Sequence, residues 1–125
     1  MPKVKQLNVV VKGKIGALDR LCSALGEAKI NINGMMATRE VVRMLVDDPE
    51  KASSVLDEIG IYNAIEDVLA FELDHMPGSA SAVTTKLANQ GVNIRYAYTA
   101  AHTESKKAIL VLSVADMTDA LEATR

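Results

Sequence analysis

The chain has 125 residues, a single cysteine, a net charge of −2 and 49% apolar residues. This composition predicts a globular protein, excludes an intramolecular disulfide, and gives no basic excess for binding nucleic acid or an anionic membrane. No apolar run reaches the roughly 18 residues of a membrane-spanning helix, and Met1–Lys5 lacks the apolar core of a signal peptide. We therefore expect a cytoplasmic protein built as one ordinary domain or two very small ones.

Apolar periodicity divides the first half of the chain into strand, helix, strand, strand, helix and strand. The first helix has apolar residues at the i, i+3, i+4 and i+7 spacing of one face, which places Cys22 in the core rather than at a reactive site. Asp48 and Pro49 start the second helix, and Gly60 ends it. The expected elements cover Val4–Lys12, Leu18–Leu25, Ile30–Met36, Val42–Val46, Pro49–Ile59 and Ile61–Glu66.

The second half follows the same order but has no candidate for a sixth element. Tyr96 and Tyr98 share the alternation of Val92 and Ile94, and we expect them to face the helices. Without a final strand, the first strand of this half keeps an open edge unless another segment, such as one from a second copy, pairs with it. The expected elements cover Val68–Asp74, Ala80–Leu87, Val92–Tyr98, Leu110–Val114 and a helix after Asp116.

The two halves match at a single offset of 62 positions. The identical residues lie in the first strand, the turn after it, the face of the first helix and the start of the second strand, which indicates an internal duplication. The identical pairs are Leu7 and Leu69, Gly16 and Gly78, Leu25 and Leu87, Asn31 and Asn93, and Ile32 and Ile94.

The turn of the second half has the chemistry of a small anion site. Pro77 fixes φ, and Gly78 lets the backbone approach a ligand closely. The N–H groups of Gly78, Ser79 and Ala80 open a helix and are expected to accept the carboxylate of a free amino acid. The side-chain oxygen of Asn93 or of Asp74 would accept its ammonium group.

The run Pro77–Ala80, the helix after it and the run Gly91–Ile94 resemble the ACT domain. Nearly the whole chain resembles a tandem ACT protein, with one unit at 1–66 and a second at 67–125 that lacks its final strand. The resemblance implies an α+β fold of two ferredoxin-like βαββαβ units, with antiparallel sheets and the helices on one face. It also implies that ACT units assemble side by side, as a homodimer, and bind an amino acid between units.

The resemblance assigns ligand contacts to the loop after the first strand and to the asparagine that starts the second strand. The first unit departs from the family pattern, because Ile15 replaces the usual proline and Lys29 replaces the glycine that closes the helix. Both asparagines also fit a purely structural role as turn residues, and His75 fits a solvated turn. The assigned contacts are His75, Met76, Gly78 and Asn93 in the second unit, and Gly13, Ile15, Gly16 and Asn31 in the first.

Other classes of function fit the sequence less well. Lys12 and Lys14 flank Gly13, but no nucleophile and base accompany them, so we expect no catalytic residues and no enzymatic activity. The histidines and Cys22 show no metal-ligand spacing, so neither a metal nor a cofactor is expected. The expected function is that of a non-catalytic regulatory module that senses an amino acid. The alternative is a structural subunit that pairs with itself or a partner protein and binds no small ligand.

Overall fold

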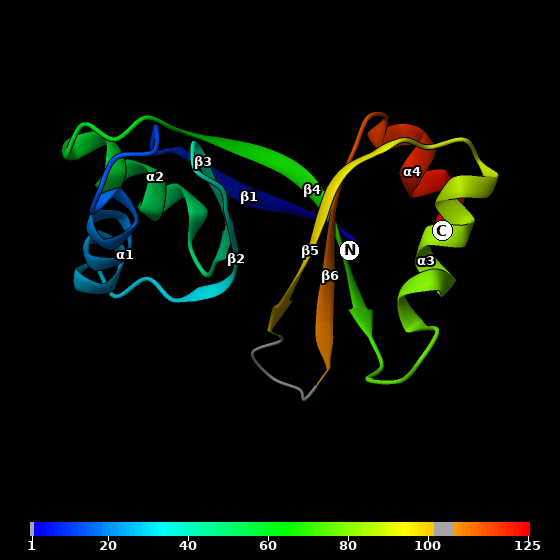
Figure 1. The fold of residues 1–125 in the computed structure, drawn as a ribbon. Coiled ribbons are helices and arrows are strands. Elements are labelled where there is room, and N and C mark those ends of the chain that lie inside the picture. Colours follow the sequence, from blue (N-terminus) through cyan, green and yellow to red (C-terminus); the bar gives the residue numbers. More distant parts are fainter. Residues whose placement is uncertain (1, 102–106) are drawn as a thin grey trace. The chain divides into compact units, whose positions relative to one another are not determined.

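The computed structural model describes residues 2–101 and 107–125, so most of the hairpin between the last two strands lies outside the described residues. Its strands join in the hydrogen-bonding order β2-β3-β1-β4-β6-β5, with antiparallel neighbours (Figure 1). The α+β class and the antiparallel sheet are thus confirmed. In chain order the elements are β1 (Lys3–Val10), α1 (Ala17–Glu27), β2 (Ile32–Ala37), β3 (Val41–Val46), α2 (Pro49–Glu58), β4 (Asn63–Leu73), α3 (Ser79–Asn89), β5 (Ile94–Ala101), β6 (Ala108–Val114) and α4 (Met117–Ala123).

One strand differs from its expected extent. The two strands expected at Ile61–Glu66 and Val68–Asp74 form a single strand, β4, of 11 residues. No glycine, proline or other turn-forming pair interrupts the chain between Glu66 and Val68, so the extended backbone continues through this point. Residue contacts divide the chain within β4: Lys5–Glu66 form one compact unit, and Met1–Val4 join Asp67–Arg125 in the other.

The N-terminal unit (Lys5–Glu66) packs α1 and α2 on one face of its strands (Figure 1). Helix α1 has a wide apolar stripe, and α2 begins with the Asp48 cap, whose carboxylate accepts the Lys51 N–H at 3.0 Å. Burying this core removes its apolar side chains from water, which supplies most of the unit's stability. The buried residues are Leu7, Val9, Leu21, Leu25, Ile30, Val42, Met44, Val46, Ala52 and Leu56.

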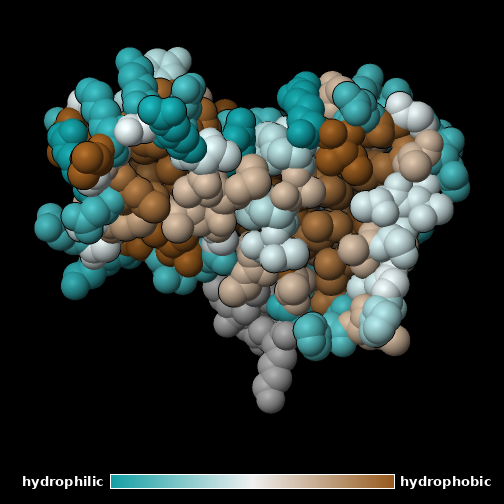
Figure 2. Space-filling model, in the orientation of Figure 1, coloured by the Kyte–Doolittle hydropathy of each residue, from teal (hydrophilic) through white to brown (hydrophobic). Residues whose placement is uncertain are grey.

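The C-terminal unit (Asp67–Arg125 with Met1–Val4) has a smaller core beneath α3 and α4. Helix α3 buries only Leu87, whereas α1 buries both Leu21 and Leu25. The surface of α3 is also nearly uncharged, and it appears in pale tones at the right of Figure 2. The buried core residues of this unit are Leu69, Leu87, Val92, Leu110, Leu112, Val114 and Ala120.

The start of β1 occupies the edge of β4 that the second half of the sequence leaves open. The Ala70 N–H donates to the Pro2 carbonyl at 2.7 Å, and the Val10 N–H donates to the Tyr62 carbonyl at 3.0 Å. The first bond lies within the C-terminal unit, and the second, to the residue that directly precedes β4, lies within the N-terminal unit. No strand follows α4 in the described residues, and the chain's own N-terminal segment takes the edge position.

The expected orientation of the two tyrosines is wrong, because β5 contains a bulge. Ile94 pairs with Val114 in the core, but the register shifts before Tyr96, which pairs with Ser113, and Tyr98 then pairs with Val111. One extra residue reverses the alternation of side chains after it. Both tyrosines therefore lie on the helix-free face of the sheet.

The same bulge occurs 62 positions earlier. The register of β2 shifts between Ile32 and Gly34, so that Met35 pairs with Met44 of the core and Met36 pairs with Arg43 on the other face. If side chains alternated regularly from Ile30 onward, Met36 would face the core. The bulge reverses this alternation, and Met36 faces away from the core. The duplicated irregularity shows that the two units share backbone geometry at a position where their side chains differ.

The two units also close their first helix in the same way, but with different residues. Lys29 has φ 62° and Gly91 has φ 69°, and the following residue bonds back to Leu25 or Leu87 at 3.0 Å in both cases. A side chain is strained in this left-handed conformation and glycine is not. We expect Lys29→Gly to raise the free energy of unfolding by about 0.5–1 kcal/mol. Urea denaturation measures this change.

The reciprocal variant is the control for that prediction. A Cβ at Gly91 would meet no atom within 4 Å, so Gly91→Lys tests the backbone strain without a steric clash. It should lower the free energy of unfolding by a similar amount. Equal stabilities of Lys29→Gly and the parent protein would contradict the strain argument.

Candidate functional site

The turns that open α1 and α3 have nearly identical geometry. Gly16 (φ 79°, ψ −1°) and Gly78 (φ 90°, ψ −8°) occupy the N-cap positions in the left-handed region, and neither cap has a side chain that bonds the helix. In each turn, the residue after the glycine donates its N–H back across the turn, from Ala17 to Lys14 at 3.2 Å and from Ser79 to Met76 at 3.3 Å. The duplication therefore preserves the shape of the turn even though Ile15 replaces Pro77.

The first turn of α3 keeps backbone donors that point away from the helix. The Ser79 N–H is engaged by Met76, whereas the N–H groups of Gly78, Ala80 and Ser81 have no partner within residues 2–101 and 107–125. Helix α3 has no acidic residue in its first turn, while α1 has Asp19 there. Since a carboxylate in the first turn already offsets the positive end of a helix dipole, the helix end by itself attracts an external anion more strongly at α3 than at α1.

The side chains around this turn are solvent-exposed. Met76 is 63% exposed, and His75 is also exposed. The Asp74 carboxylate lies 3.0 Å from the Lys107 ammonium, which also lies 3.4 Å from Glu72. The hydrogen bond and charge of Asp74, with a smaller contribution from Glu72, raise the pKa of Lys107. Asp74 therefore already has a counter-ion, and a second cation could bind it only in place of Lys107.

The two asparagines differ in what they bond. The Asn31 side chain donates to Asn33 Oδ1 at 2.9 Å, so it already has a partner along its own strand. The Asn93 side chain is exposed and forms no hydrogen bond within the described part of the chain, although its carbonyl accepts the Ala115 N–H at 3.0 Å. Asn93 therefore has amide groups available for a ligand, and Asn31 has fewer.

Within one unit the structure does not bring Asn93 and the Gly78 turn together. Gly78 precedes the first residue of α3 and Asn93 follows its end, so the helix separates them (Figure 1). Eleven helical residues span about 16 Å, which exceeds the length of any common amino acid. A single ligand therefore cannot contact both of these residues of one unit. Gly16 and Asn31 lie at opposite ends of α1 in the same manner.

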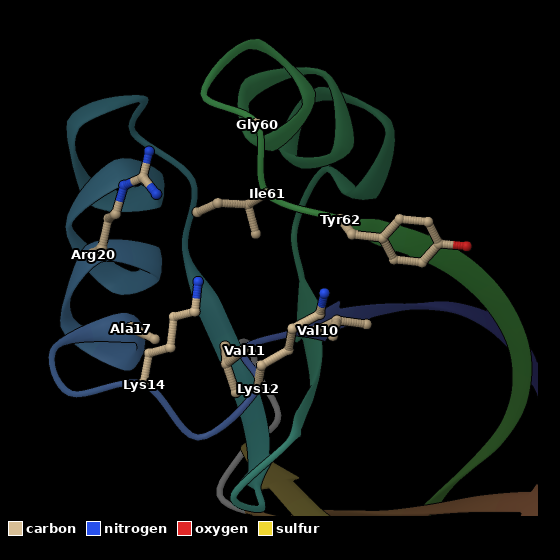
Figure 3. A pocket seen from close by; sticks show the side chains of 9 residues that line it. All are labelled: Val10, Val11, Lys12, Lys14, Ala17, Arg20, Gly60, Ile61 and Tyr62. Carbon is tan, nitrogen blue, oxygen red and sulfur yellow. The ribbon is translucent and has the colours of Figure 1, made fainter.

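A cavity of about 200 Å³ in the N-terminal unit adds residues that sequence reasoning missed (Figure 3). Of these residues, Arg20 and Tyr62 have the side chains best suited to contact a ligand. Neither belongs to a sequence motif that would have identified it. Lys12 and Lys14 of the cavity flank Gly13, but Gly13, Ile15, Gly16 and Asn31 do not line it. The lining consists of Val10, Val11, Lys12, Lys14, Ala17, Arg20, Gly60, Ile61 and Tyr62.

The described residues contain one thiol, that of Cys22, and no cluster of metal ligands. Cys22 is half-buried, and desolvation together with the charge of Asp19 raises the pKa of its thiol, which makes it a poor nucleophile. No cluster of three potential metal ligands occurs among the residues that the structure describes. None of the described helices is long and apolar enough to cross a membrane.

Comparison with known proteins identifies the family. The family described as "ACT domain pair" matches residues 2–124, so the chain belongs to this family. Among curated proteins, no sequence matches the chain. The fold is similar to the crystal structure of protein BT0572 from Bacteroides thetaiotaomicron, at 26% identity and a TM-score of 0.84, over 98% of this chain and 86% of that one.

Two further structures share the fold at lower identity. The ligand-free regulatory subunit of aspartate kinase from Thermus thermophilus matches with 19% identity and a TM-score of 0.64, over 96% of this chain and 88% of its own. E. coli aspartokinase III in complex with lysine and aspartate matches with 14% identity and a TM-score of 0.58, over 98% of this chain and 29% of its own. The present chain thus corresponds in extent to the separate regulatory subunit rather than to the whole kinase.

Proposed function

We propose that this protein is a non-catalytic regulatory module that binds a free amino acid at the turn of α3 and acts as a homodimer. The observation that carries the proposal is the Gly78 turn, with unpaired N–H groups at Gly78, Ala80 and Ser81 and no acid in the first turn. Backbone donors at the positive end of a helix suit the α-carboxylate of an amino acid.

The ammonium group of the ligand needs acceptors that the turn does not supply by itself. The Asn93 side chain has a free amide oxygen, but it lies at the other end of α3. A second copy of the chain that packs with its helix antiparallel to α3 would place its own Asn93 near the Gly78 turn. The nearly uncharged surface of α3 favours such packing, because few charges would lose their hydration.

The comparisons support the regulatory part of the proposal. A separate regulatory subunit of aspartate kinase has the same fold over most of its length, and aspartokinase III has been crystallised with lysine and aspartate. Identities below 25% carry the fold and not the ligand, so the amino acid recognised by this chain follows from its own residues. We infer that binding orders the Gly78 turn and shifts the association of the module with its target.

The test is a thermal-shift screen of the common amino acids on the parent protein and on the variant Ala80→Glu. Binding to the folded state alone stabilises it by about 2.7 kcal/mol at 100 times Kd, so a true ligand gives a clear rise. A glutamate in the first turn favours the helix but repels a carboxylate. Ala80→Glu should therefore keep or raise the basal melting temperature and lose the response. The control is Thr118→Glu, which adds the same charge on the exposed surface of α4 in the same unit and should keep the response.

A mixing experiment tests the shared site. If the Gly78 turn of one copy meets Asn93 of another, Asn93→Ala and Ala80→Glu each abolish binding, but an equimolar mixture regains roughly a quarter of the sites. Half of the dimers then contain both variants, and each of those has one intact site. If the mixture binds nothing although each variant remains dimeric, the Gly78 turn of one copy and Asn93 of another do not form one site.

The rival function is that of an interaction subunit without a small ligand. The observation that favours it is the same α3 surface, which is weakly buried and nearly uncharged. A flat amino-acid screen on a well-folded and monodisperse sample would replace the sensor proposal with this one. Loss of self-association in Thr85→Glu, which adds a charge in the middle of α3, would then locate the contact on that helix.

A further inference from the structure

The cavity of the N-terminal unit combines an apolar floor with an unusual excess of positive charge. Val10, Val11, Ala17 and Ile61 form its apolar part, while Lys12, Lys14 and Arg20 contribute cationic groups and no carboxylate belongs to the lining. Figure 3 shows Lys12 and Lys14 rising from the loop toward the segment that carries Ile61 and Tyr62. We propose that this cavity is a binding site for a small dianion with an apolar body, such as a phosphate monoester or a dicarboxylate.

The cations of the site are not neutralised elsewhere. Neither Lys12, Lys14 nor Arg20 forms an ion pair within residues 2–101 and 107–125. Arg20 donates one hydrogen bond to the Ile59 carbonyl at 2.8 Å, which fixes its guanidinium beside the Gly60–Tyr62 segment and leaves other N–H donors unused. An anion in this cavity would therefore meet cationic donors and no carboxylate of the lining.

A fourth cation lies behind the loop. The Arg39 side chain packs against Gly13 so closely that a Cβ there would lie 2.8 Å from Nε. Arg39 likewise has no ion pair among the described residues. A monovalent anion would leave most of this charge uncompensated, which is why the site favours a dianion.

The backbone of the loop is held in a conformation that lysine seldom adopts. Lys12 has φ 53°, in the left-handed region that favours glycine or asparagine. This conformation costs on the order of 1 kcal/mol and persists because neighbouring contacts enforce it. Hydrogen bonds from the Val11 and Lys12 N–H groups to the Glu40 carbonyl, at 2.9 and 3.3 Å, hold the loop in place. The loop is therefore preorganised before any ligand arrives.

The size of the cavity limits the ligand. A volume of about 200 Å³ corresponds to roughly seven water molecules at about 30 Å³ each, so the site admits only a small molecule. The corresponding positions of the second half are Asp74, Met76 and Ala82, which carry no positive charge, so the site belongs to the N-terminal unit alone. It does not depend on the amino-acid site proposed at α3 and can exist without it.

The test is titration of the full chain with phenyl phosphate, glutarate and butyrate, followed by backbone NMR. The two dianions should shift the amides of Val11, Ala17 and Ile61 in a saturable manner at millimolar concentration, and butyrate should not. Preference for phenyl phosphate would identify a phosphate monoester, and preference for glutarate a dicarboxylate. Inorganic phosphate that binds as tightly as phenyl phosphate would contradict the role of the apolar floor.

Matched variants separate the site from general charge effects. Lys14→Met keeps the aliphatic stem and should weaken dianion binding by about tenfold, since it removes one charge-assisted hydrogen bond. Lys12→Asn tolerates the left-handed backbone and should have a similar effect even if Lys14→Met folds poorly. Lys51→Met removes the same charge on α2 of the same unit and should change affinity by less than about twofold. Equal losses in Lys14→Met and Lys51→Met, or no shift with either dianion, would overturn the proposal.

Discussion

Leu25→Ala should lower the free energy of unfolding by about 3 kcal/mol, and Leu87→Ala should do the same at the matching position. Both side chains are fully buried, and each lies on the first helix of its unit. Removing three carbons leaves a cavity that the packed strands beneath cannot close. Urea denaturation followed by circular dichroism measures the loss.

The two variants should differ in how they affect their helices. Helix α1 retains Leu21 as a second buried anchor, but α3 has no other fully buried side chain. Leu87→Ala should therefore accelerate amide exchange throughout α3 more than Leu25→Ala does in α1. Leu18, which is 39% exposed, provides the control, and Leu18→Ala should cost less than about 1 kcal/mol. A loss in Leu25→Ala no larger than in Leu18→Ala would contradict the assignment of the core.

The order of elements was predictable because helix stripes, strand alternation and caps are local signals. The Asp48 cap and the apolar stripe of α1 occur as the sequence indicated. The bulges at Ile32 and Ile94 could not be predicted, because an inserted residue changes the facing of side chains without changing composition. The expected facing of Tyr96 and Tyr98 was wrong for this reason.

The candidate sites were also predictable only where a local sequence signal exists. The turn glycines were found because only glycine adopts their conformation without strain, and the positive φ of Gly16 and Gly78 agrees with this. The cavity joins Lys12 and Lys14 to Arg20 and to the Gly60–Tyr62 segment, which is distant in sequence. No local pattern connects these residues, because strand pairing between β1 and β4 brings them together. Likewise, the repeat that contains both Gly78 and Asn93 did not indicate that they lie at opposite ends of α3.

Deleting residues 2–4 should destabilise the C-terminal unit by about 2 kcal/mol, because it removes strand hydrogen bonds such as the one from the Ala70 N–H to the Pro2 carbonyl. The first strand of the second half otherwise lacks a neighbour on this edge, and the bond from the Ala70 N–H to the Pro2 carbonyl shows what replaces it. Hydrogen exchange at Ala70 is the most direct measurement, and we expect it to accelerate at least about tenfold. The opened edge should also promote association that increases with protein concentration.

A side-chain variant shows whether the effect of the deletion comes from the loss of backbone pairing or from the loss of a charged side chain. Lys3 is exposed, so Lys3→Ala keeps the backbone pairing while it removes the charge and should leave exchange at Ala70 unchanged. If the deletion also leaves Ala70 protected, a different segment, such as the edge of a second copy, must cover β4 in solution. Protection that is lost only on dilution would identify that second copy, because a contact within one chain does not depend on concentration.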